Sequence, residues 1–295
     1  MRQRKLGKVP LQPYLLQKAM SEYQYYRFEC LDGHLSSSQR QALRQISSRA
    51  DISTASFQVS YHYSDLKAEL QQMMLDNFDI GVYFASWGAQ VAYIKLPQGT
   101  LPAELLQFRA YGFSVYDTDQ WQLLVFSNEE SERYLDDEDA EELLQHLANL
   151  RGELLQGDWR LVYFIWLRAF DIDAEPDAIP LINFDFQQLS VAQRAFVDLF
   201  DVPLAVVKAL ALTLANAPSH SANPAQLQLD KWLEQLTEIE KDQLLQVVFT
   251  EGQLTKHAAV AMTRKPAESE HYQYWLDSAI ITPYIDTAAT QLAQQ

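Results

Sequence analysis

The chain has 295 residues, 48% of them hydrophobic and 12% aromatic, and its 39 acidic and 23 basic side chains give a net charge of −16. This length supports a real hydrophobic core and roughly one to three domains, of which we favour two. The acidity argues against general binding to a phosphate backbone, which depends on Lys and Arg. A single cysteine, Cys30, excludes an intrachain disulfide framework and a multi-cysteine zinc site.

Residues 1–19 carry several Lys and Arg side chains and no acid. They lack the apolar stretch and the small-residue cleavage site of a signal peptide, and we predict a poorly ordered extension. No run approaches the roughly 18 apolar residues that a membrane helix needs. The most apolar run, residues 161–167, ends at Arg168 and is better explained by a buried helix. We therefore expect a cytoplasmic protein that makes no membrane contact.

The segment YQYYRFE, residues 23–29, alternates in a way that is typical of a strand. Its two faces carry Tyr26, Phe28 and Cys30 on one side and Tyr23, Tyr25, Arg27 and Glu29 on the other. Aromatic rings mixed with arginine can stack on nucleic-acid bases. The acidic neighbours and the overall charge instead favour packing on the helical half of the chain, or on a partner, so we predict no nucleic-acid binding.

Helix and strand signals then alternate along the chain. Ser36 and Gln39 have the spacing of a capping box, which predicts a helix N-terminus. Residues 57–63 return to the period of a strand, and Asp65 is the expected cap of a second helix that extends towards Phe78.

Two hairpins and a short helix follow. Trp87, Gly88 and Ala89 separate two apolar runs and predict a hairpin with glycine in its turn. Pro102 lies in the first turn of a short predicted helix. Residues 117–120 are the predicted turn of the second hairpin.

The strand signals largely stop after residue 130. Residues 139–157 and 158–170 have helical character, and the second of these segments is apolar nearly all round, as in a central helix. Ser190 and Gln193 form a second capping-box pattern. The last predicted helix is expected to break near Pro283.

These signals predict an α+β fold in two domains. A mixed, mainly antiparallel sheet with helices on one face is expected over residues 20–130. An all-α part is expected over residues 131–295, and its helices are the natural cover for the second face of the sheet.

Four segments resemble a family of uncharacterised bacterial proteins. EYQYYRF (residues 22–28) matches an EYQYYEF-like strand, and SWGA (residues 86–89) an NWGT-like hairpin. Residues 147–167 match an LRAELLRGDLRALYLGWL-like helix, and residues 232–245 a WLxxLxxxEKDxLL-like element. The joint occurrence of these four segments is more specific for the family than any single segment. The resemblance implies no activity, cofactor or catalytic residue, and it places the usual start of the family near Met20.

The acidity concentrates in residues 128–144. Acids suit the N-terminus of a helix because they interact favourably with its dipole. They can also form a docking surface for a basic protein partner. The candidate partner-binding residues are Asp136, Asp137, Glu138, Asp139, Glu141 and Glu142.

Aromatic side chains also recur at helical spacing after residue 157. If the helical part covers the first strand, these rings and the strand tyrosines would form an interdomain surface, where ligands are often bound. The residues of this predicted surface are Tyr23, Tyr25, Trp159, Tyr163 and Trp166.

Catalytic signals are weak throughout. His62 and Asp65 could form a base and its orienting carboxylate, and acids within residues 171–177 could supply oxygen ligands for Mg²⁺ or Ca²⁺. The simpler interpretation of His62 and Asp65 is an exposed strand histidine followed by a helix cap. The simpler interpretation of residues 171–177 is an acidic loop between helices. No nucleophile elbow, phosphate-binding loop or zinc motif occurs in the sequence.

We therefore predict no catalytic residues, no metal and no cofactor. The expected function is a non-enzymatic interaction protein, such as an adaptor or accessory subunit that binds a protein partner, and the acidic segment would suit a basic one. The alternative is an enzyme or small-molecule-binding protein with its site between the sheet and the helical part.

Overall fold

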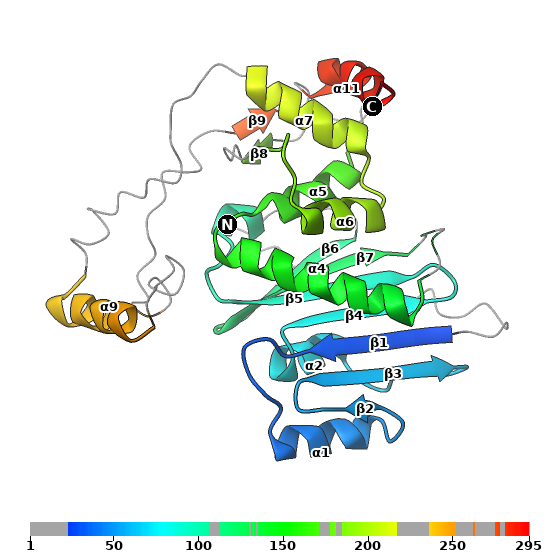
Figure 1. Cartoon of the computed structure of the whole chain (residues 1–295), viewed down its shortest axis with the longest axis vertical. Helices are drawn as coiled ribbons and strands as arrows, with labels where there is room; N and C mark the ends of the chain where they lie inside the picture. Colours follow the sequence, from blue (N-terminus) through cyan, green and yellow to red (C-terminus); the bar gives the residue numbers. More distant parts are fainter. Residues whose placement is uncertain are drawn as a thin grey trace, which may run out of the picture.

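The computed structural model describes residues 23–106, 112–129, 131, 133, 135–170, 178–180, 185–216, 236–251, 262, 275–277 and 281–294. A seven-stranded sheet lies at the centre of the molecule, with helices on both of its faces (Figure 1). The predicted α+β class, with a sheet first and helices after it, is confirmed.

The sheet has the strand order β2-β3-β1-β4-β5-β7-β6, and each of these neighbouring pairs is antiparallel. Its strands are β1 (Tyr23–Glu29), β2 (Asp51–Ile52), β3 (Ser56–His62), β4 (Ile80–Ala85), β5 (Gln90–Pro97), β6 (Phe113–Asp117) and β7 (Trp121–Asn128). The first strand of the chain is therefore an inner strand of the sheet, paired with both β3 and β4.

Helices precede, interrupt and follow these strands. They are α1 (Ser37–Ile46), α2 (Leu70–Asn77), α3 (Ala103–Leu106), α4 (Asp137–Leu155), α5 (Arg160–Arg168), α6 (Val191–Leu199), α7 (Leu204–Asn216), α9 (Glu238–Glu251) and α11 (Ile285–Leu292). The part after residue 130 also contains a short antiparallel pair, β8 (Ala178–Pro180) with β9 (Trp275–Asp277), and a 3₁₀ turn η3 (Thr282–Tyr284). The sequence had predicted only helix there.

Local signals that the sequence showed are confirmed in the structure. Both capping boxes form, with Ser36 before α1 and Ser190 before α6. Both hairpins form, and Gly88 has φ +95°, a conformation that favours glycine. A Cβ at Gly88 would also lie only 2.4 Å from the Ser131 carbonyl oxygen, so the turn and its neighbour require glycine here.

The start of α2 differs from the prediction. Asp65 does not cap the helix, which begins at Leu70 with Glu69 in the N-cap position. Asp65 instead accepts a hydrogen bond from the side chain of Gln24 on β1, at 2.8 Å. A tertiary partner thus takes the carboxylate that local sequence assigned to the helix.

The two faces of β1 enter two hydrophobic clusters. Tyr26 and Phe28 join the smaller cluster, which α1 and α2 cover. Tyr25 joins the larger cluster, in which strands β4, β5 and β7 pack against α4 and the helices after it. Figure 1 shows α4 running across the sheet, and its closest strand contacts are with β4 and β5. The prediction that helices from the C-terminal part cover the second face of β1 is confirmed.

The larger cluster crosses the predicted domain boundary at residue 130. It contains Ile94 and Phe126 of the sheet together with Leu147 of α4 and Phe164 of α5, each fully buried. Each of residues 161–167 in α5 is buried, as expected for a central helix. None of the described helices is long and apolar enough to cross a membrane.

Candidate functional site

The first turn of α4 collects most of the acids that the sequence singled out. Asp136 is the N-cap, and its carboxylate accepts hydrogen bonds from the backbone N–H groups of Glu138 and Asp139 at 2.9 and 3.0 Å. The Asp139 carboxylate in turn accepts from the Asp136 N–H at 2.9 Å. These two predicted partner-binding residues therefore start the helix, as a reciprocal capping box does.

The other four predicted acids project from α4 and are exposed. Asp137 accepts a hydrogen bond from the Tyr23 hydroxyl at 2.6 Å. Glu141 lies 3.6 Å from Arg27, and its side chain is 63% exposed. Glu142 is 76% exposed. We call Asp137, Glu138, Glu141 and Glu142 the acidic face of α4.

Tyr23 lies beside the acidic face of α4, and it is the first of three rings in a row. The Tyr23 ring is 5.2 Å from the His62 ring, and His62 is 6.4 Å from Tyr63. Tyr63 is 78% exposed and has φ +75°, which is uncommon for a bulky residue and costs energy. We call these three residues the aromatic ladder, and the Tyr23 hydroxyl connects it to Asp137. The sequence pattern paired His62 with Asp65 as a candidate base and orienting carboxylate, and it carried no signal that His62 lies beside Tyr23.

Tyr25 is only 1% exposed and lies beneath α4. Burial raises the pKa of its hydroxyl, and the negative charges of Asp137 and Glu141 add to this effect while Arg27 opposes it. The ring is stacked on Phe84, with the ring centres 4.9 Å apart. Tyr25 is therefore a core side chain and does not present a surface to bases.

The remaining residues of the predicted interdomain surface belong to the same larger core. Tyr163 and Trp166 of α5 are 3% and 7% exposed, and Trp159 packs against the cluster. Tyr163 makes a ring contact with Phe186, and Trp166 makes one with Phe170. The rings of α5 thus fill the helical side of the core, while Tyr23 contacts His62 and Phe84 at the edge of β1.

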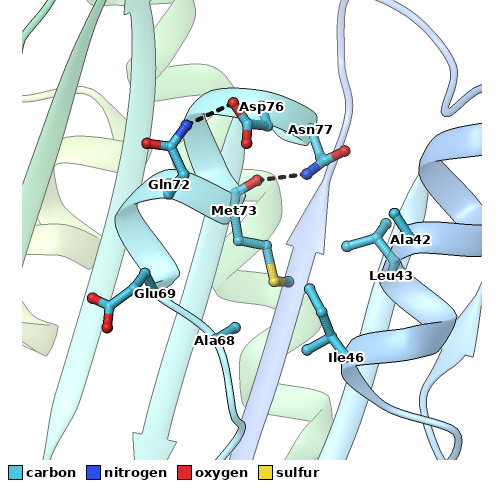
Figure 2. Close-up of a pocket in the computed structure, with 9 residues that line it drawn as sticks. All are labelled: Ala42, Leu43, Ile46, Ala68, Glu69, Gln72, Met73, Asp76 and Asn77. Atoms are coloured by element: carbon cyan, nitrogen blue, oxygen red, sulfur yellow. Dashed lines mark hydrogen bonds between the residues drawn. The ribbon is translucent and has the colours of Figure 1, made fainter.

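A groove of about 260 Å³ lies between α1 and α2 on the opposite face of the sheet (Figure 2). Its apolar wall and floor come from Ala42, Leu43, Ile46, Ala68 and Met73. Its polar rim comes from α2 and consists of Glu69, Gln72, Asp76 and Asn77. The lining therefore includes two carboxylates and no Lys or Arg.

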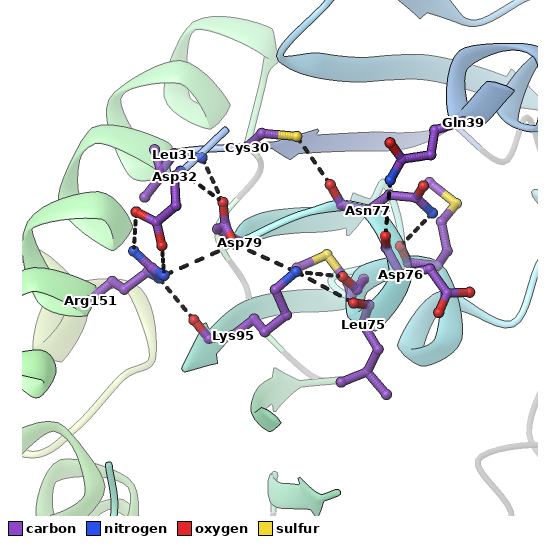
Figure 3. A network of polar contacts seen from close by, with 12 residues as sticks. Cys30, Leu31, Asp32, Gln39, Leu75, Asp76, Asn77, Asp79, Lys95 and Arg151 are labelled. Atoms are coloured by element: carbon purple, nitrogen blue, oxygen red, sulfur yellow. Dashed lines mark hydrogen bonds and ion pairs between the residues drawn. The ribbon is translucent and has the colours of Figure 1, made fainter. Parts of the chain in front are cut away.

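The C-terminal end of α2 leads from the groove to a buried ionic cluster (Figure 3). Asp79, Lys95 and Arg151 are the charged side chains that are buried in the described part of the chain. Asp79 accepts hydrogen bonds from the backbone N–H groups of Leu31 and Asp32, at 2.7 and 3.1 Å. It also lies 3.5 Å from the Lys95 ammonium group.

Arg151 joins α4 to this cluster. Its guanidinium group makes a two-pronged ion pair with Asp32 and donates to the Lys95 carbonyl oxygen at 2.8 Å. Lys95 lies 3.4 Å from the carbonyl oxygens of Met74 and Leu75, at the C-terminal end of α2, where a positive charge is favourable. All three buried charges are thus paired, which suits a structural connection between the two layers.

Cys30 lies at the edge of the same cluster. Its thiol is 3.0 Å from the Asn77 carbonyl oxygen. Burial raises the pKa of Cys30 to about 11, with a further contribution from the charge of Asp79. A thiol with this pKa is protonated near neutral pH, so it is a poor nucleophile.

A second polar network joins α4, α5 and α6. Arg160 is bidentate to Asp158, and the buried Gln193 side chain donates to Glu153 and Asp158 at 2.8 and 3.0 Å. Arg160 also donates to the carbonyl oxygen of Asp185. The polar residues of the 147–167 segment, which carries the family resemblance, therefore hold helices together.

The weak catalytic candidates do not form a closed site. His62 and Asp65 are both exposed, and neither lines the groove between α1 and α2. Residues 171–177, the candidate oxygen-ligand loop, lie outside the described residues. Within the residues that the structure describes, no group of three or more His, Cys, Asp or Glu side chains could hold a metal ion.

Comparison of the chain with protein-family models, with curated proteins and with solved structures found no match. The resemblance drawn from the four sequence segments therefore stays a prediction. The assignment of a function depends on the two surfaces and the ionic cluster described above.

Proposed function

We propose that this protein is a non-enzymatic accessory or adaptor subunit of the cytoplasm, and that it binds a basic segment of another protein. The observation that carries the proposal is the acidic face of α4 beside the aromatic ladder. Carboxylates next to exposed rings suit Lys and Arg, which can form an ion pair and a cation–π contact at the same place.

The positions of the charges support binding over catalysis. The buried charged groups among the described residues are all paired in one cluster, which links layers of the fold. Several accessible carboxylates gather on the acidic face, where Glu138, Glu141 and Glu142 are exposed on one helix. Complementary charge on a partner would steer association and would make it sensitive to salt.

The test is a pull-down of the tagged full chain from a lysate of its source organism, with mass spectrometry as the readout. We expect one protein near stoichiometry at about 50 mM salt that is lost at about 300 mM. Glu138→Lys/Glu142→Lys should abolish capture. Asp119→Lys/Glu129→Lys changes the charge equally at exposed positions elsewhere and should leave capture intact.

Equal loss of partner capture in the two double variants would show a general effect of charge and would contradict the proposed site. A clean preparation without a partner, at both salt concentrations, would contradict the adaptor function itself.

A further inference from the structure

The acidic face of α4 carries negative charge that its described neighbours do not neutralise. Glu138 is three residues from Glu141 and four from Glu142, so these side chains are neighbours on the helix surface, where like charges repel. Among the described residues, no Lys or Arg pairs with Glu138 or Glu142, and Glu142 lies 3.6 Å from His146. Arg27 is 3.6 Å from Glu141 but pairs more closely, at 2.9 Å, with another carboxylate on β1. A positive charge on this face would relieve the repulsion.

A buried hydroxyl beside this face also lacks a partner. Tyr25 is 1% exposed, and its hydroxyl makes no hydrogen bond although Arg27 lies next to it. Burial raises the pKa of this hydroxyl, and the charges of Asp137 and Glu141 on the acidic face raise it further. Buried polar groups are usually paired. Both the charge and the hydroxyl therefore favour a ligand that carries positive charge and hydrogen-bond donors, as Lys and Arg do.

The chain itself contains a segment of the opposite charge. Residues 1–21 contain no Asp or Glu, and their basic side chains are Arg2, Arg4, Lys5, Lys8 and Lys18. By contrast, residues 134–150 contain no Lys or Arg. Residues 1–22 lie outside the described residues, so the poorly ordered extension expected from the sequence stays a prediction. Attraction between charges depends on their distance, so it needs no fixed backbone conformation of the segment.

The basic segment is attached to the fold beside the acidic face. It leads into β1 at Tyr23, whose hydroxyl donates to Asp137 at 2.6 Å. Lys18 is five residues before Tyr23, and five extended residues span at most about 17 Å. The acids from Asp137 to Glu142 extend over about 8 Å of the helix axis. Lys18 can therefore reach each carboxylate of the face, and so short a tether gives a roughly millimolar effective concentration.

We propose that residues 1–19 bind the acidic face of α4 within the same molecule, through their Lys and Arg side chains. This inference rests on the proposed function, because it uses the same surface and adds that a basic partner has to displace a segment of this chain. The partner's apparent affinity is then reduced by the fraction of molecules in which the face is free. A second copy of the chain is a weaker competitor, since the tethered segment is present at every dilution.

The experiment measures how fast trypsin cleaves within residues 1–19 of the full chain, which carries its tag at the C-terminus. Trypsin cleaves after Lys and Arg, so binding of these side chains to α4 should protect them. Mass spectrometry quantifies the released fragments, and a small arginine substrate corrects for the effect of salt on trypsin itself. We expect cleavage after Lys18 to be at least about fivefold faster at about 300 mM salt than at about 50 mM.

Two double variants locate the protecting surface. Glu138→Gln/Glu142→Gln retains the size of two exposed side chains, and at low salt it should be cleaved as fast as the wild type is at high salt. The control, Asp117→Asn/Asp119→Asn, removes the same charge at exposed positions. It lies in the turn between β6 and β7, at the opposite end of the sheet from Tyr23, and should stay protected. Cleavage that is independent of salt, or equal loss of protection in both variants, would overturn the proposal.

Carbodiimide crosslinking, which joins a Lys amine to a nearby carboxylate, identifies the contact directly. We expect the monomer to contain crosslinks from Lys5, Lys8 or Lys18 to residues 137–142, with a yield that tenfold dilution does not change. Crosslinks to other acids only would overturn the proposal. A yield that falls on dilution would also do so, because it would show contact between two copies.

These results are separate from the test of the adaptor function. Protection of residues 1–19 without capture of a partner protein would contradict only the adaptor function. Capture of a partner by a chain whose residues 1–19 are unprotected would contradict only the internal contact.

Discussion

The two ends of α4 carry charge in opposite settings. At its C-terminal end, Arg151 is 3% exposed and is held by Asp32 and by the carbonyl oxygen of Lys95. At its N-terminal end, Glu138, Glu141 and Glu142 are exposed to solvent. A buried charge that loses its partner is costly, whereas an exposed one is hydrated and free to meet another molecule. One helix therefore connects the layers at one end and offers a binding surface at the other.

The largest effect on stability is expected from loss of the buried charge of α4. Arg151→Ala leaves Asp79 and Lys95 without one member of their cluster and removes the link from α4 to Asp32. We expect a loss of about 2–3 kcal/mol in the free energy of unfolding, measured by urea denaturation, because the buried Lys95 carbonyl oxygen loses its charged donor while Asp79 keeps its ion pair with Lys95.

The matched control is Arg133→Ala. Arg133 makes an ion pair of 2.9 Å with Asp198, but both side chains are exposed, at 44% and 69%. We expect Arg133→Ala to lower the free energy of unfolding by less than about 1 kcal/mol. Similar losses in the two variants would contradict the distinction between buried and exposed charge.

The thiol at the edge of the cluster gives the next largest effect. Because the pKa of Cys30 is raised from 9.0 to about 11, alkylation by iodoacetamide at pH 9 should be about tenfold slower in the native chain than in urea. The smaller thiolate fraction outweighs the higher nucleophilicity of each thiolate. Equal rates would show that Cys30 is accessible and unperturbed.

The raised pKa of Cys30 also makes the free energy of unfolding depend on pH. The folded state favours the protonated thiol, so this contribution is complete below about pH 9 and is lost as the pH rises towards 11. Denaturation at several pH values should therefore show a steeper decline for the wild type than for Cys30→Ala. Buried tyrosines shift in the same direction and are common to both proteins.

At the exposed end, Asp136 is the residue whose loss matters for stability. Asp136→Ala removes the N-cap acceptor of two backbone N–H groups. We expect the free energy of unfolding, measured by urea denaturation, to fall by about 1 kcal/mol. Asp136→Asn retains an acceptor and should recover most of it, whereas an equal loss in both variants would argue for charge over capping.

The smallest effect is expected at Glu142. Its exposed side chain lies 3.6 Å from His146 and has no other ion pair among the described residues. Glu142→Gln should change the free energy of unfolding by less than about 0.5 kcal/mol. A larger loss would place this residue in the fold and not on a binding surface.

Short-range patterns in the sequence determined much of this architecture. The alternation over residues 23–29 assigned Tyr25 and Tyr26 to opposite faces, because successive side chains of a strand point to opposite sides. The capping boxes at Ser36 and Ser190 and the glycine at residue 88 marked element ends, since their hydrogen bonds and backbone angles involve neighbours in sequence. The acids before α4 likewise marked its start.

The tertiary structure alone decided which distant groups meet. Asp32 and Arg151 are 119 residues apart and carry no local signal of their ion pair. Asp65 had a plausible local role as a cap, but Gln24 of the neighbouring strand takes its carboxylate. The contact of Tyr23 with Asp137 and the groove between α1 and α2 also depend on how the layers pack. Such contacts follow from burial of whole faces, whereas the local patterns show only which faces each element has to bury.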